Sequence, residues 1–179
     1  MSRKLVINIH LYLAAFFAPM VVIMALSGGL YLLGVKGNVE KETVAVVPVK
    51  IDTQSSDLEQ QVRDLLQEQG LNSNFQYLKH RGENLDTRPT NRQFYQLLQR
   101  DDGLHIVAAK PDLIAALIEL HKGHGPTLYK QFEIAFSMAL VVIMLSGLYL
   151  GLASKGLKTR TIQLSLSGTA LFLILALLA

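Results

Sequence analysis

Three long apolar stretches, separated by polar sequence, dominate the hydropathy pattern of this chain. They run from Leu5 to Leu33, from about Phe132 to Ala153 and from about Thr161 to Ala179. A helix that crosses a hydrocarbon layer of roughly 30 Å needs about 20 residues, which each stretch supplies. The pattern therefore predicts three transmembrane helices, at residues 1–34, 127–153 and 161–179, with a short basic turn at residues 154–160.

The first two apolar stretches contain nearly the same phrase. The residues VVIMALSGGLYL at 21–32 return as VVIMLSGLYL at 141–150. Small residues, which let helix backbones approach closely, are Ser27, Gly28 and Gly29 in the first stretch and Ser146, Gly147 and Gly151 in the second. They predict packing within the chain, or an interface with a second copy or another membrane protein. Because the copies would cross the membrane in opposite directions, we expect their Ser-Gly steps not to touch each other.

The start of the chain has two interpretations. A secretory signal peptide would account for the basic residues Arg3 and Lys4 and for the small residues at 25–27. The apolar run continues to Leu33, however, and the second copy of the phrase lies where no signal peptide can be. The pattern therefore favours a retained transmembrane helix.

Basic residues near the ends of the apolar stretches predict the orientation of the chain. The basic residues that would share one side are Arg3, Lys4, Lys155, Lys158 and Arg160. Positive charges favour the cytoplasmic side, so we expect the N-terminus in the cytoplasm and residues 35–131 on the opposite side.

The polar region predicts an extended segment followed by a small domain. Residues 35–54 include a β-branched stretch, Val44–Ile51, in which Pro48 suits a linker or an edge strand better than a central strand. The domain, at residues 55–126, begins with a helix that Ser55-Ser56-Asp57 would cap and that Gly70 would end. The residues of its apolar face are Leu58, Val62, Leu65 and Leu66.

Strands and a second helix account for the rest of the domain. Strands are expected at 75–81, 92–100 and 104–109, with a polar loop at 84–89. Residues 100–103 predict a tight hairpin turn in which Gly103 adopts a positive φ. The second helix starts at Pro111 and Asp112, and its expected apolar face is Leu113, Ala116, Leu117 and Leu120, widened by Ile114 and Ile118. The expected fold is thus a membrane α-helical protein with an inserted α+β domain, a helix packed on a small antiparallel sheet.

The second helix ends in His121-Lys122-Gly123-His124, shortly before a span that contains Leu-Ser-Gly, and Ile9-His10-Leu11 opens the first span. With the helix and three strands between them, these phrases resemble a PepSY domain flanked by PepSY-associated transmembrane helices. The resemblance implies a bacterial inner-membrane protein whose residues 35–131 are periplasmic. PepSY modules of peptidase propeptides bind and restrain the protease, and membrane relatives occur with iron and siderophore uptake. Larger relatives with more spans resemble haem-carrying reductases.

Three histidines are candidate haem ligands: His10, His121 and His124. Haem b between helices needs two axial imidazoles with nitrogens about 4 Å apart. His10 is expected at the cytoplasmic end of its span and the other two on the outer side, so one chain cannot pair them. Haem b would have to be shared between subunits or with a partner. Otherwise we expect an interfacial position for His10, and helix C-capping or divalent-metal binding for His121 and His124.

Composition excludes several functions. The chain contains no cysteine, which excludes disulfides and thiolate metal sites. Its net charge is only +3 and its basic residues are scattered, so no nucleic-acid footprint is present. No hydrolytic or phosphate-loop motif occurs, and no catalytic or metal-binding residue is assigned.

These observations predict a non-enzymatic accessory or regulatory protein of the lipid bilayer, whose outer domain binds a partner protein or peptide, with a link to iron or siderophore uptake. A homo-oligomer is compatible with this role. The alternative is a haem b-dependent electron-transfer or ferric-siderophore reductase component that shares haem between subunits.

Overall fold

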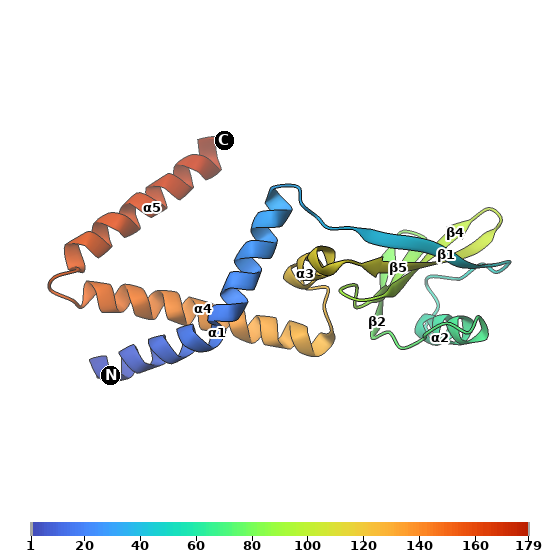
Figure 1. Cartoon of the computed structure of the whole chain (residues 1–179), viewed down its shortest axis with the longest axis horizontal. Helices are drawn as coiled ribbons and strands as arrows, with labels where there is room; N and C mark the ends of the chain where they lie inside the picture. Colours follow the sequence, from blue (N-terminus) through green and yellow to red (C-terminus); the bar gives the residue numbers. More distant parts are fainter. Residues whose placement is uncertain (1, 179) are drawn as a thin grey trace. The chain divides into compact units, whose positions relative to one another are not determined.

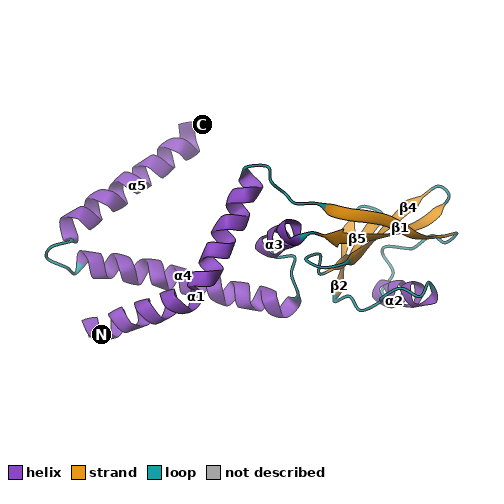
Figure 2. Ribbon diagram, viewed as in Figure 1, coloured by secondary structure: helices purple, strands orange, loops and turns teal. Residues whose placement is uncertain are grey.

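The computed structural model describes residues 2–178. Within these residues, five helices and five strands follow one another in the order α1 (Arg3–Leu32), β1 (Val39–Val47), α2 (Leu58–Glu68), β2 (Tyr77–Arg81), β3 (Asn84–Arg88), β4 (Phe94–Arg100), β5 (Gly103–Pro111), α3 (Leu113–His121), α4 (Thr127–Leu152) and α5 (Lys158–Leu178) (Figures 1 and 2). The chain divides into two compact units. One holds the chain up to Met20 and from Ile134 onward, and the other runs from Val21 to Glu133.

Three helices, α1, α4 and α5, are long and apolar enough to cross a membrane. They confirm the three long helices that the hydropathy pattern predicts. The turn between α4 and α5 is shorter than expected, because Lys158 already belongs to α5. The backbone carbonyl of Ser154 accepts hydrogen bonds from the amides of Leu157 and Lys158, and these bonds start the helix before the apolar residues begin.

The unit from Val21 to Glu133 is built on a five-stranded antiparallel sheet with the strand order β1-β5-β4-β3-β2. Helix α2 packs on one face of this sheet. The buried cluster between them consists of Leu58, Val62, Leu65, Leu66, Phe75, Leu85, Tyr95, Leu97, Leu104 and Ile106. All four apolar residues predicted for the first helix of the domain therefore lie in the core, and the expected mixture of helices with an antiparallel sheet is confirmed.

The turn between β4 and β5 forms as the sequence predicts. Arg100 pairs with Gly103 across the hairpin, and the φ angle of Gly103 is 133°. A side chain at this position would press on the backbone carbonyl oxygen of Val47, so the site requires glycine for its conformation and for the space around it.

The polar loop expected at residues 84–89 is wrong, because residues 84–88 form strand β3. Leu85 is its only strongly apolar residue, so the strand has no apolar stretch that sequence analysis could recognise. Asp86, Thr87 and Arg88 are nevertheless buried. They are held by polar partners on neighbouring segments, and sequence polarity alone suggested exposure.

Part of the segment expected as a linker, residues 35–54, forms the edge strand β1. The edge-strand interpretation of this segment is therefore the one observed. Pro48 lies just beyond the end of β1, where its missing amide removes no bond to β5. Because residues 40–42 are charged, the first half of β1 lacks an apolar pattern that would indicate a strand.

Helix α3 begins where predicted but buries only part of the predicted face. Asp112 caps it, since the side-chain Oδ1 accepts a hydrogen bond of 2.8 Å from the amide of Ala115. The buried residues are Ala115 and Ile118, whereas Leu113 is 75% exposed. Gly37 lies against the backbone of Ala115. Of the residues predicted for the apolar face, Ile118 is therefore buried and Leu113 is not, and the buried Ala115 lies outside the predicted set.

Candidate functional site

Polar side chains gather on the face of the sheet opposite α2. Asp86 is paired with Lys79 on one neighbouring strand and with Gln96 on the other, and paired residues project from the same face. Leu85 and Leu97, which alternate with them, point into the core. The side of the sheet that faces α2 is thus apolar, and the opposite side carries charged residues next to apolar ones such as Phe94 and Val107.

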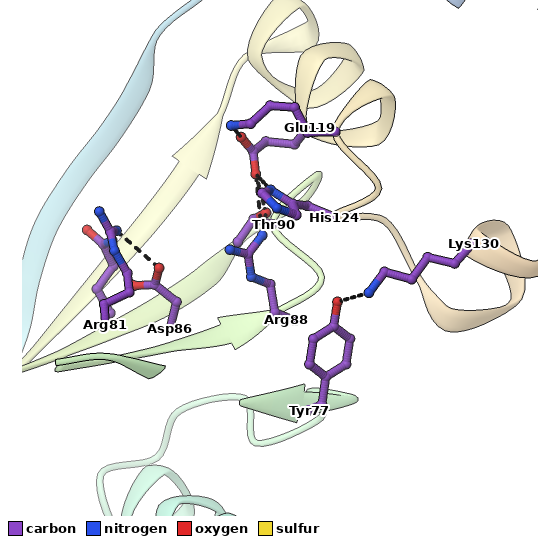
Figure 3. A network of polar contacts seen from close by, with 10 residues as sticks. Tyr77, Arg81, Asp86, Arg88, Thr90, Glu119, His124 and Lys130 are labelled. Atoms are coloured by element: carbon purple, nitrogen blue, oxygen red, sulfur yellow. Dashed lines mark hydrogen bonds and ion pairs between the residues drawn. The ribbon is translucent and has the colours of Figure 1, made fainter. Parts of the chain in front are cut away.

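Asp86 lies on this charged face and is only 3% exposed. Its Oδ1 accepts a hydrogen bond of 3.0 Å from Gln96 Nε2. Its Oδ2 lies 3.1 Å from Nη1 of Arg81 (Figure 3). Both carboxylate oxygens are therefore satisfied, as a buried charge requires.

A second carboxylate, that of Glu119 on α3, connects three segments (Figure 3). Its Oε2 accepts hydrogen bonds from the Thr90 hydroxyl at 2.5 Å and from His124 Nδ1 at 2.8 Å. Arg88 Nη1 donates to the Thr90 oxygen at 2.7 Å and lies 3.5 Å from Oε2 of Glu119. The other oxygen, Oε1, accepts from Lys122 at 2.6 Å. Glu119 thereby joins the β3–β4 connection to the end of α3.

The surroundings of Glu119 change two ionisation equilibria. Burial by itself would raise the pKa of Glu119, but the hydrogen bonds from Lys122, Thr90 and His124 outweigh it and lower the pKa to about 2. Burial lowers the pKa of His124, an effect that its bond to Glu119 opposes and the nearby charge of Arg88 reinforces. At neutral pH Glu119 is a carboxylate, and a neutral His124 donates to it through Nδ1–H.

A pocket of about 460 Å³ lies over this charged face. Its basic lining residues are Lys36, Lys41, Lys79, Arg81, Arg88 and Lys122, and its acidic ones are Asp86 and Glu119. Ala115 and Ile118 of α3 and Phe94 of β4 supply the apolar part of the wall. Basic side chains outnumber acidic ones, so the pocket attracts anions.

The predicted histidine candidates lie in two kinds of surroundings. His124 belongs to the Glu119 network described above. His121 lies against the end of α1: its Nδ1 is 3.2 Å from the Ser27 hydroxyl oxygen, and a Cβ added to Gly28 would lie 3.0 Å from its ring. The Ser27 hydroxyl itself donates to the carbonyl of Met24 at 3.1 Å.

His10 has the same surroundings in the other unit. Its Nδ1 lies 3.0 Å from the Ser146 hydroxyl oxygen, and a Cβ added to Gly147 would lie 3.1 Å from its ring. The Ser146 hydroxyl donates to the carbonyl of Ile143 at 3.0 Å. Each copy of the repeated phrase therefore holds one histidine with its Ser-Gly step. These contacts show packing within the chain at Gly28 and Gly147.

The remaining small residues differ. A Cβ added to Gly151 would meet the side chain of Thr161 at 2.6 Å, so Gly151 brings α4 and α5 close together. A Cβ added to Gly29 would meet no atom within 4 Å. Among residues 2–178 no cluster of three or more His, Cys, Asp or Glu residues is arranged to hold a metal ion.

The charged pocket was not predicted from the sequence. Its lining comes from α1, β1, β2, β3, β4, α3 and the connections after α1, β3 and α3, which are scattered over the sequence. The only local signal is the alternation Leu85-Asp86-Thr87-Arg88, which reads as a strand with a charged face once a partner strand is assumed. No protein-family model, curated protein or solved structure matches this chain.

Proposed function

We propose that this chain is a membrane-anchored, non-enzymatic binding module whose domain outside the cytoplasm binds an extended segment of a partner protein. The observation that carries this proposal is the free edge of strand β2. Within residues 2–178, the backbone of β2 forms hydrogen bonds to β3 alone. An edge strand with unpaired amide and carbonyl groups accepts an additional strand from another chain.

The two edges of the sheet differ in how well they suit strand addition. Strand β1 is interrupted by a bulge between Thr43 and Ala45, a feature that discourages pairing at an edge. Strand β2 pairs regularly with β3 from Tyr77 to Arg81. Lys79 and Arg81 on β2 also line the charged pocket, so an added strand with acidic side chains would find opposite charges there.

The proposed anchor consists of α1, α4 and α5, all of which are long and apolar enough to cross a bilayer. Many of their large apolar side chains are exposed in the chain by itself, as lipid-facing residues would be. We place the N-terminus and the α4–α5 turn in the cytoplasm, where the basic residues of both are favoured, and residues 35–131 in the periplasm of a bacterial cell.

The sheet with its helix α2 supports, as a likeness of layout, the PepSY-like interpretation of residues 55–126. The partner would then be a protein that the domain restrains or recruits, as PepSY propeptides do with their proteases, in a setting of iron or siderophore uptake. This part of the proposal rests on the motifs in the sequence and on analogy between folds.

Photo-crosslinking in cells tests the binding edge. A photoreactive amino acid at His80, on β2, should give a discrete adduct with a membrane or periplasmic protein, whereas the same amino acid at Glu42, on β1, should not. Hydrogen exchange of the full chain with the purified partner should then show protection of residues 77–81. Equal adducts at both edges, or a partner that leaves these amides unprotected, would contradict the proposal.

Haem b binding is the second candidate function. The contacts of His10 with Ser146 and of His121 with Ser27 favour it. Ser27 and Ser146 each donate their hydroxyl proton to a helix carbonyl, so each accepts from the histidine Nδ1–H. The Nε2 atoms of His10 and His121 then carry the free lone pair, the arrangement found in histidines that ligate metals. The second ligand of each iron would come from another subunit or a partner protein.

Absorption spectra of the full chain, purified in detergent from haem-replete cells, decide on this candidate. Haem b would give a reduced α-band that His10→Ala or His121→Ala diminishes and the control His80→Ala preserves. A folded, monodisperse protein without haem bands would eliminate it.

A further inference from the structure

The charged pocket lies where the domain meets the apolar helices of its own unit. Tyr31, on the last turn of α1, lines the pocket, and the Lys36 amine lies 5.4 Å from the centre of the Tyr31 ring. Lys122 and His124 line it from the connection between α3 and α4. Tyrosine and lysine are typical of the layer where lipid headgroups lie.

The carboxylates of the pocket are already neutralised by partners within the pocket. Asp86 is bonded to Arg81 and Gln96, and both oxygens of Glu119 accept hydrogen bonds. The side-chain amines of Lys36, Lys41 and Lys79, by contrast, form no ion pair or hydrogen bond within residues 2–178, and the Lys36 amine lies over the Tyr31 ring. The uncompensated charge of the pocket is therefore positive.

We propose that this pocket binds the phosphate of an anionic phospholipid in the leaflet on the domain's side of the membrane. The inference rests on the membrane insertion put forward above, and it adds a ligand that the partner-binding edge does not require. Lys36, Lys41 and Lys79 supply unpaired positive charge for the phosphate. Phosphate is a ligand that lysine binds as a point charge, without the paired geometry that arginine favours.

Two features favour a lipid over free phosphate as the source. The pocket includes Tyr31 on an apolar helix, so a headgroup in it would keep its acyl chains beside that helix. The volume of about 460 Å³ also exceeds the need of a single phosphate ion and leaves space for a glycerol headgroup. Clusters of basic residues next to a transmembrane helix bind anionic lipids through the same attraction.

Native mass spectrometry of the full chain in detergent tests the proposal. Phosphatidylglycerol should be retained by the wild-type chain, and uncharged diacylglycerol should not. The variant Lys36→Gln/Lys41→Gln removes two unpaired charges, and its affinity for phosphatidylglycerol should fall about tenfold, because each lysine attracts the anionic headgroup and salt screens part of this attraction. The control Lys50→Gln/Lys110→Gln removes the same charge from residues outside the pocket and should bind as the wild type does.

The remaining outcomes each decide the question. Displacement of phosphatidylglycerol by millimolar inorganic phosphate, or equal loss in both double variants, would overturn the assignment of a lipid headgroup to this pocket. Carbonate extraction of membranes from cells producing the chain tests insertion separately. A chain that stays in the membrane but retains no anionic lipid contradicts this inference alone, and a chain that is extracted contradicts the proposed anchor as well.

Discussion

The Nδ1 atom of His10 lies 3.0 Å from the hydroxyl oxygen of Ser146, 136 residues away in the sequence. The same relationship joins His121 to Ser27. In both cases the residue after the serine is a glycine on which the imidazole ring rests. The repeated sequence in the two apolar helices therefore forms the same kind of histidine contact twice. This contact accounts for the Ser-Gly step that both copies contain.

The contact between His121 and Gly28 predicts opposite effects of alanine substitution at Gly28 and at Gly29. In Gly28→Ala the new methyl group would lie 3.0 Å from the His121 ring, whereas Gly29→Ala places it in open space. We expect Gly28→Ala to destabilise the protein by about 1–3 kcal/mol, the usual effect of overpacking, and Gly29→Ala to stabilise it by up to about 1 kcal/mol through helix propensity. Unfolding of the two variants in detergent measures the difference. A Gly28→Ala variant as stable as the Gly29→Ala variant would show that the His121 ring does not pack on Gly28.

The carboxylate of Glu119 predicts acid sensitivity. Its pKa is lowered from 4.5 to about 2 in the folded protein, so ionised Glu119 favours the folded state. This contribution is fully present above about pH 4.5 and is lost as the pH falls towards 2. We expect Glu119→Gln to cost about 2 kcal/mol at pH 7, after allowance for partial exposure, and to flatten the loss of stability in this pH range. Thermal unfolding from pH 2.5 to 7 checks this.

A control separates this effect from general charge removal. Glu68→Gln removes a carboxylate from the exposed end of α2, and its unfolding should follow the wild-type pH profile. If both variants flatten the profile equally, the acid sensitivity does not originate in the Glu119 network.

The β2–β3 turn at Gly82 and the β4–β5 turn at Gly103 predict a ranking of two glycine substitutions. Gly103 and Gly82 both have a positive φ, but only at Gly103 would a side chain also meet the backbone of the β1 end. Gly82→Ala should therefore cost about 1 kcal/mol through conformation alone, and Gly103→Ala should cost more than twice as much. Chemical denaturation of both variants tests the ranking, which a smaller effect at Gly103 would reverse.

The position of the core predicts a contrast between two leucines. Leu66 is fully buried against the sheet, and Leu113 is 75% exposed at the start of α3. We expect Leu66→Ala to cost about 2–5 kcal/mol and Leu113→Ala less than about 0.5 kcal/mol. A large loss for Leu113→Ala would mean that a lipid, a partner or another part of the protein covers this face of α3.

Much of the architecture follows from periodic apolar residues. The long helices are recognisable because each apolar run exceeds the length of a soluble core helix, and α2 because its four core residues recur at helical spacing. The β4–β5 hairpin follows from a turn sequence that ends in glycine. In each case the signal lies within one element, where neighbours in sequence decide the conformation.

The elements that escaped prediction depend on contacts between segments. Strand β3 carries a single apolar core residue, and its buried Asp86 is tolerated only because Gln96 and Arg81 provide partners. On α3 the sequence indicates the buried Ile118 but not the buried Ala115, which lies against Gly37, a residue distant in sequence.

The sequence by itself determined which segments are apolar enough to span a membrane, which residues form the α2 face and where the hairpin turns, because these depend on local spacing. Only the tertiary structure decided that the lysines at 36, 41 and 79 share one pocket and that each Ser-Gly step meets a histidine distant in sequence. Charged and polar side chains carry no period that reveals their partners. Their placement becomes visible only once strand order and helix rotation bring them together.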